Sequence, residues 1–248
     1  MVYSSTTLLI ISQTDFRGTG SHKTTIMKKT LLAIIMLAYS LSTWAQEDVT
    51  RFLGIPVDGT KREMIEKLKA KGFEPHPTEK DCLIGEFNGE NVMLFIQTQN
   101  NKVWRIVVGD ITHRDAINIK IRFNELCRQF LKNKKYFTLY SESELMIPDD
   151  EDIAYNILVN NKRYEAAFLQ LPQKNVAKID SIMQTKYTEI QREYPTEEDK
   201  KEMKAIILQE IEIKENNIVW FTINEIYGEF SIAIYYENRR NQANGEDL

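Results

Sequence analysis

The chain has 248 residues, with 32 Lys or Arg against 36 Asp or Glu and a formal net charge of −4. This acidic balance argues against a nucleic-acid partner, because nucleic-acid binding depends on clustered Lys and Arg that displace counterions from phosphates. The length allows one domain with a large core or two small ones.

The sequence predicts a secretory signal peptide at Met27–Ala45. This segment begins with two lysines and continues with Leu31–Leu41, an uncharged apolar run that is too short to cross a bilayer, which takes about 20 residues. Small residues at its end predict cleavage before Gln46. We therefore expect a periplasmic or secreted protein with no membrane span in its mature part.

Residues 1–26 precede the signal peptide and are mostly polar. We interpret them as a non-native extension, with translation starting at Met27, because a signal normally stands at the extreme N-terminus. The alternative is a long N-terminal region that belongs to the signal itself. Residues 1–45 hold four basic residues and one acid, so residues 46–248 carry 28 basic and 35 acidic residues, a net charge of −7.

The first predicted unit covers residues 46–140 and begins with a helix. Thr60 and Glu63 form a capping-box pattern, apolar residues follow at helical spacing, and Gly72 marks the end of the helix. A second helix is predicted at Arg114–Lys132, where apolar residues form a stripe. We expect this second helix to pack on a sheet.

Three strand-like runs lie between these helices, at Asp81–Phe87, Val92–Gln97 and Val103–Val108. Asn88 and Gly89 join the first two runs, and Asn-Gly is a strong hairpin signal because both residues accept positive φ. The three runs therefore predict an antiparallel meander.

The second predicted unit, residues 141–248, contains a strand at Tyr164–Leu171 and helical stretches near 174–192 and 196–212. It ends with a hairpin of two aromatic-rich strands, Ile218–Ile223 and Glu229–Tyr236. The fold class is therefore α+β, an antiparallel sheet of meander plus terminal hairpin with helices packed on it. The units can form one domain or two related halves, although they share no residue pattern.

The opening FLGIPVDGTKREMIEKLKAKGF (Phe52–Phe73) and the ending IYYENRRNQANGEDL (Ile234–Leu248) resemble a group of uncharacterised exported proteins of Gram-negative anaerobes. This resemblance implies a small, signal-bearing α+β protein and carries no activity. A helix before a meander also resembles, more faintly, beta-lactamase-inhibitor-like and outer-membrane-assembly lipoprotein modules. That likeness concerns the fold alone, and a fold does not determine function.

The two cysteines, Cys82 and Cys127, leave two alternatives open. In an oxidising compartment they could form a disulfide, whose closed loop would stabilise the fold by about 2–4 kcal/mol. Alternatively, both are buried and act as small apolar residues, one at the start of a strand and one on the apolar face of a helix.

No pattern in the sequence predicts a catalytic, cofactor or metal site. His76 and His113 stand far apart, without the short spacings of zinc ligands. The sequence contains neither of the two Gly-rich phosphate-binding patterns, G-x-x-x-x-G-K and G-x-G-x-x-G. We expect no metal and no cofactor. The sequence leaves open whether the protein is an enzyme, and it favours a protein without catalytic activity.

Aromatic residues on the predicted strands give the best functional hypothesis. Trp104, Trp220 and Tyr236 could line one exposed face of the sheet, since exposed apolar patches usually mark interaction sites. We therefore predict an exported non-catalytic binding or protein-interaction module, whose partner is an envelope protein or a glycan. The alternative is a small secreted hydrolase acting on glycans or peptides.

Overall fold

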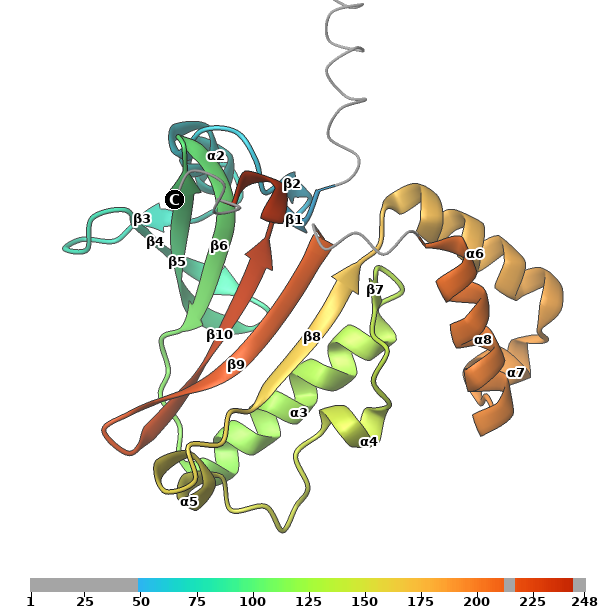
Figure 1. Ribbon diagram of the computed structural model, residues 1–248. Coiled ribbons are helices and arrows are strands. Elements are labelled where there is room, and N and C mark those ends of the chain that lie inside the picture. The colour runs from blue at the N-terminus through green and yellow to red at the C-terminus, as the bar shows by residue number, and fades with distance from the viewer. Residues whose placement is uncertain (1–48, 212–216, 243–248) are drawn as a thin grey trace, which may run out of the picture. The chain divides into compact units, whose positions relative to one another are not determined.

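The computed structural model describes residues 49–211 and 217–242 (Figure 1). The predicted signal peptide, Met27–Ala45, and the extension before it lie outside these residues, so export stays a prediction. Within the described ranges, none of the helices has the length and apolar character that crossing a membrane requires.

The centre of the molecule is an antiparallel sheet of eight strands in the order β3-β4-β5-β6-β10-β9-β8-β7. Two further short strands, β1 and β2, pair with each other. The strands are β1 (Arg51–Phe52), β2 (Ile55–Pro56), β3 (Glu74–Pro75), β4 (Cys82–Phe87), β5 (Glu90–Gln99), β6 (Lys102–Asp110), β7 (Tyr136–Phe137), β8 (Glu165–Gln170), β9 (Ile218–Ile226) and β10 (Glu229–Glu237).

The predicted α+β class, with its meander and terminal hairpin, is confirmed. Strands β4, β5 and β6 form the meander, and β9 and β10 form the hairpin. Strand β10 also pairs with β6, so the two predicted units contribute to one sheet. The structure does not show two separate halves.

The longer helices of the described residues fall in the predicted stretches, with one break, whereas the short helices α4 and η2 were not predicted. The helices are α2 (Lys61–Lys69), α3 (Ala116–Lys132), α4 (Glu142–Leu145), α5 (Ile153–Leu158), α6 (Gln173–Lys186), α7 (Glu189–Glu193), α8 (Glu197–Glu210) and the 3-10 helix η2 (Arg239–Asn241). The capping box of Thr60 and Glu63 is present at the start of α2. The stretch predicted at 174–192 is divided into α6 and α7, because Thr188 begins a new helix with a capping box of its own.

One face of the sheet forms the main core. Leu94, Val108, Ile234 and Phe221 are paired in a row across β5, β6, β10 and β9, and none of them is more than 1% exposed. Helices α2 and α3 contribute buried residues to the same cluster, and Figure 1 shows α3 lying along the sheet. We call this the inner face and the opposite one the outer face.

A second, smaller apolar cluster lies where the helices α6 and α8 meet the β7–β8 edge of the sheet. Its buried members are Phe137 on β7, Ile179 on α6 and Ile211 at the end of α8, and Leu169 of β8 packs against them. Helices α6 and α8 therefore pack on a part of the sheet that is separate from strands β5, β6 and β10.

Candidate binding surface

A row of four large side chains crosses the outer face of the sheet. Phe95 of β5 is paired with Val107 of β6, Val107 with Tyr235 of β10, and Tyr235 with Trp220 of β9. Residues that are directly opposite in antiparallel strands point to the same face. Each of these four is the immediate chain neighbour of one of the buried inner-face residues, so alternation directs it outward. We call these four residues the cross-strand row.

Two rings of the row are held in a fixed arrangement. The centroids of Trp220 and Tyr235 lie 4.0 Å apart with an interplanar angle of 9°, which is a stacked pair. The guanidinium carbon of Arg105 lies 5.2 Å from the Tyr235 centroid and 4.0 Å from that of Trp104. The Trp220 indole N–H donates to Glu237 at 2.9 Å, and Arg105 forms an ion pair with the same carboxylate. Because Glu237 is buried, this network limits the movement of the rings.

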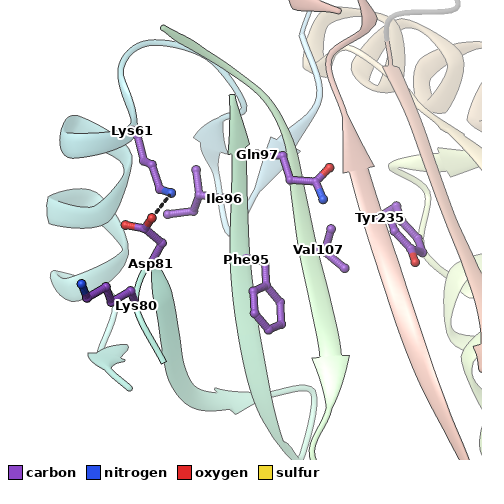
Figure 2. Close-up of a pocket in the computed structure, with 8 residues that line it drawn as sticks. All are labelled: Lys61, Lys80, Asp81, Phe95, Ile96, Gln97, Val107 and Tyr235. Atoms are coloured by element: carbon purple, nitrogen blue, oxygen red, sulfur yellow. Dashed lines mark ion pairs between the residues drawn. The ribbon is translucent and has the colours of Figure 1, made fainter. Parts of the chain in front are cut away.

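An open pocket of about 330 Å³ adjoins the part of the row that ends at Phe95, away from Trp220 (Figure 2). Phe95, Val107 and Tyr235 lie on its apolar side, on three neighbouring strands. Lys61 and Asp81 form an ion pair of 3.0 Å beside them. The full lining is Lys61, Lys80, Asp81, Phe95, Ile96, Gln97, Val107 and Tyr235.

The structure corrects one of the three aromatic residues predicted for this surface. Tyr236 is 4% exposed and lies in the core, where its ring centroid is 4.9 Å from that of Phe52. Its partners on the neighbouring strands, Ile106 and Val219, are fully buried. Tyr235, one residue earlier, therefore takes the outer position.

The other two predicted residues do lie near the surface. Trp220 is half-buried within the cross-strand row, and Trp104 is half-buried under the guanidinium group of Arg105. Sequence reasoning missed Phe95 and Gln97. Alternation in β5 could have found them, because Val92, Leu94 and Ile96 occupy every second position and leave the residues between them to the outer face.

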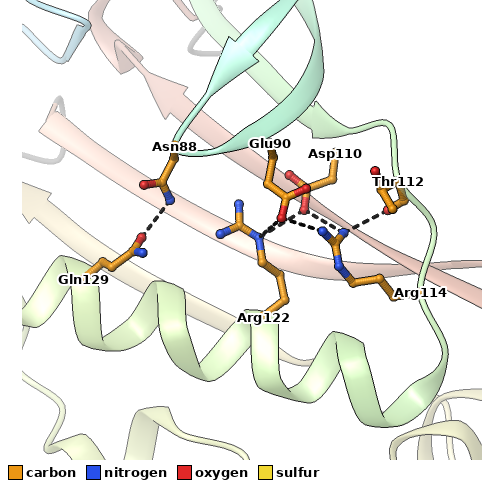
Figure 3. Close-up of polar contacts among 7 residues, drawn as sticks. All are labelled: Asn88, Glu90, Asp110, Thr112, Arg114, Arg122 and Gln129. Atoms are coloured by element: carbon orange, nitrogen blue, oxygen red, sulfur yellow. Dashed lines mark hydrogen bonds and ion pairs between the residues drawn. The ribbon is translucent and has the colours of Figure 1, made fainter.

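A buried group of charges ties the sheet to α3 at the far end of the meander (Figure 3). The side chain of Asp110 is 1% exposed, and its Oδ2 lies 3.3 Å from Arg122 Nε and 3.4 Å from Arg114 Nη1. Glu90 forms a second ion pair with Arg114. Burial raises the pKa of Asp110, although both arginines oppose this shift. Two cations balance two anions, so we interpret the group as structural.

The described residues offer no group of three or more His, Cys, Asp or Glu side chains positioned to hold a metal ion. His76 has a local role instead, because its Nδ1 accepts the backbone N–H groups of Thr78 and Glu79 in a turn. Of the acidic run after Pro148, Asp152 caps α5 by accepting the N–H of Tyr155.

Cys82 and Cys127 are both buried free thiols, which agrees with the second of the two alternatives drawn from the sequence. The sulfur of Cys82 contacts the carbonyl of Leu83, and that of Cys127 contacts the carbonyl of Leu145. Burial raises the pKa of Cys127 to about 12, so its thiol stays protonated at neutral pH.

Thiol titration tests this assignment. In denaturant without reductant, we expect both thiols of the chain to react, whereas the folded protein should react slowly because both sulfurs are buried. A sample reduced before denaturation should give the same total. If thiols appear only after reduction, Cys82 and Cys127 are paired.

Comparisons of the chain with protein-family models, with curated proteins and with solved structures find no match. The fold and its surface define an α+β protein whose sheet carries a row of aromatic and apolar residues on its outer face. The geometry of this face is therefore the basis for assigning a function.

Proposed function

We propose that this protein is an exported, non-catalytic binding module whose partner docks on the outer face of the sheet. The observation that carries the proposal is the cross-strand row, in which Phe95 is 38% exposed and Trp220 and Tyr235 are stacked beside Arg105. Trp, Tyr and Arg are the residue types that contribute most of the free energy of binding at protein interfaces. Export rests on the signal sequence Met27–Ala45.

The fixed position of the Trp220 ring supports this role. Ordering side chains at an interface costs about 0.5–1.5 kcal/mol for each flexible residue. The ring of Trp220 is already held by its stacking on Tyr235 and by its hydrogen bond to Glu237. A partner that docks on Trp220 therefore meets a ring that is already ordered, and less of the binding free energy is lost to ordering that side chain.

Affinity capture with matched variants tests the proposal. The full gene is expressed in its native cells with a C-terminal tag, as wild type, as Phe95→Ser with Trp220→Ser, and as Ile117→Ser. Ile117 is 69% exposed on α3 and serves as an apolar control away from the outer face. We expect specific proteins to co-purify with the wild type and the control, and to fall at least about tenfold with the row variant.

Two results would contradict the proposal. One is an identical set of captured proteins with all three forms, and the other is no enrichment over untagged cells with any of them. Near-ultraviolet circular dichroism of each purified form shows whether the row variant is folded. If that double variant unfolds, the single substitution Phe95→Ser replaces it, because Phe95 is already partly exposed.

A further inference from the structure

We propose that the pocket beside the cross-strand row binds an acidic residue of a partner polypeptide, next to an apolar side chain of the same segment that rests on Phe95 and Val107. This inference rests on the proposed function and adds the chemistry of the partner. It follows from the groups in the pocket that have no partner of their own.

The uncommitted polar groups of the pocket can all donate hydrogen bonds. Gln97 accepts a hydrogen bond from Arg105 Nη1 through its Oε1 at 3.4 Å, so its amide NH₂ is the free end. Among the described residues, no hydrogen bond or ion pair is found for the Tyr235 hydroxyl or the Lys80 ammonium, both of which belong to the pocket lining. The carboxylate in the lining, Asp81, is already paired with Lys61. The pocket therefore suits a ligand that brings acceptors.

The charges nearby favour an anion over a neutral acceptor. Lys80 is exposed and carries an unpaired positive charge at the edge of the pocket. Beside the row, Arg105 and Arg239 share the single carboxylate of Glu237, which leaves one further positive charge. The pocket lining has two lysines against one aspartate, a surplus of one positive charge, whereas the whole chain has a net charge of −4. Such complementarity attracts acidic partners and excludes basic ones.

The apolar side of the pocket requires more than a carboxylate. Phe95 is 38% exposed and has no aromatic partner among the described residues, while Val107 continues the apolar surface toward Tyr235. An acidic residue alone would leave these side chains in water. A neighbouring apolar side chain of the same segment would cover them and add the hydrophobic part of the affinity.

The extent of the surface favours a polypeptide over a small molecule. The pocket volume of about 330 Å³ lies at the lower end of the range for small-molecule sites. The row continues from Phe95 to Trp220 across three strand spacings, or about 14 Å at roughly 4.8 Å each. A segment of a partner protein can cover the pocket and the row together, whereas a ligand of pocket size would leave Trp220 uncovered.

Short peptides test the inference directly. The ¹⁵N-labelled protein is titrated with acetyl-Gly-Glu-Phe-Glu-Gly-amide, with the same peptide carrying Gln in place of Glu, and with one carrying Ala in place of Phe. We expect the amide signals of Phe95, Val107 and Tyr235 to shift. The Glu-Phe-Glu peptide should bind about three- to tenfold more tightly than the Gln form, and the difference should shrink at high salt.

Two lysine variants separate the pocket from general electrostatics. Lys80→Gln should reduce the preference for the Glu peptide to less than about twofold, and Lys80→Arg should keep it. Lys201→Gln, on the exposed face of α8, changes the net charge by the same amount and should leave the preference intact. Phe95→Ala should weaken both Phe-containing peptides while the ratio between them stays the same.

Three outcomes would overturn the inference. They are equal affinity for the Glu and Gln peptides, shifts that map away from the pocket, and phenylacetate binding as tightly as the Glu-Phe-Glu peptide, which would indicate a small-molecule site. These failures differ from failure of the proposed function. Capture that depends on the row without peptide binding would contradict the acidic partner alone, and peptide binding without row-dependent capture would contradict the proposed function alone.

Discussion

Replacing Arg122 with alanine is expected to lower the free energy of unfolding by about 3–5 kcal/mol, because the substitution leaves buried carboxylates without their full set of cations. Arg122 is 7% exposed at its side chain and lies 3.3 Å from Asp110 and 3.8 Å from Glu90. Urea denaturation at pH 7 measures this change. Arg128→Ala, on the exposed side of the same helix, is the matched control and should cost less than about 0.5 kcal/mol.

The effect of Arg122→Ala should also depend on pH. Burial already raises the pKa of Asp110, and loss of a nearby cation raises it further. An acid with a raised folded-state pKa binds an extra proton in the folded state, so stability falls as the pH rises from its unfolded pKa of about 3.9 through the folded value. The variant should therefore lose less stability relative to wild type at pH 4 than at pH 7. An equal loss at both values would contradict a charged role for this group.

Phe221→Ala is expected to cost about 3–5 kcal/mol, because it removes a ring from the centre of the inner face and leaves a cavity. Phe221 is fully buried, and its ring centroid lies 5.0 Å from that of Phe123 and 5.6 Å from that of Phe130. Its chain neighbour Trp220 points to the outer face. Trp220→Ala should cost about 1–2 kcal/mol, through the lost stacking on Tyr235 and the lost hydrogen bond to Glu237.

This pair of substitutions compares the two faces at neighbouring positions of one strand. The two chemical denaturation curves should differ clearly, and Phe221→Ala should have the lower midpoint. A Trp220→Ala variant as unstable as Phe221→Ala would mean that Trp220 belongs to the core. Trp220 could then not be counted among the residues of the proposed binding surface.

Local signals in the sequence were sufficient to predict much of the fold. The capping box at Thr60 and Glu63 marked the first helix, and Asn88-Gly89 marked the first hairpin, since both depend on contacts between residues close in the chain. The pairing of β6 with β10 could not be predicted in this way. It joins Ile106 to Tyr236, and no turn sequence specifies a contact of such separation.

The candidate site was predicted only in part, for the same reason. Tyr235 and Tyr236 are adjacent aromatic residues, and a shift of one residue in register exchanges the face on which each lies. Only the long-range pairing with Ile106 and Val107 settles that Tyr236 lies inside and Tyr235 outside. The charged group of Asp110 with Arg122 was missed because its members become neighbours only when α3 packs on the sheet.

Photo-crosslinking at Phe95 most directly tests whether the outer face is the binding surface. Benzoylphenylalanine is incorporated at Phe95 in native cells, and in separate strains at Ile117 on α3 and at Tyr227, which is 100% exposed in the β9–β10 turn. We expect irradiation to give a discrete heavier adduct from Phe95 alone. No adduct from Phe95, or the same adduct from all three positions, would contradict the account.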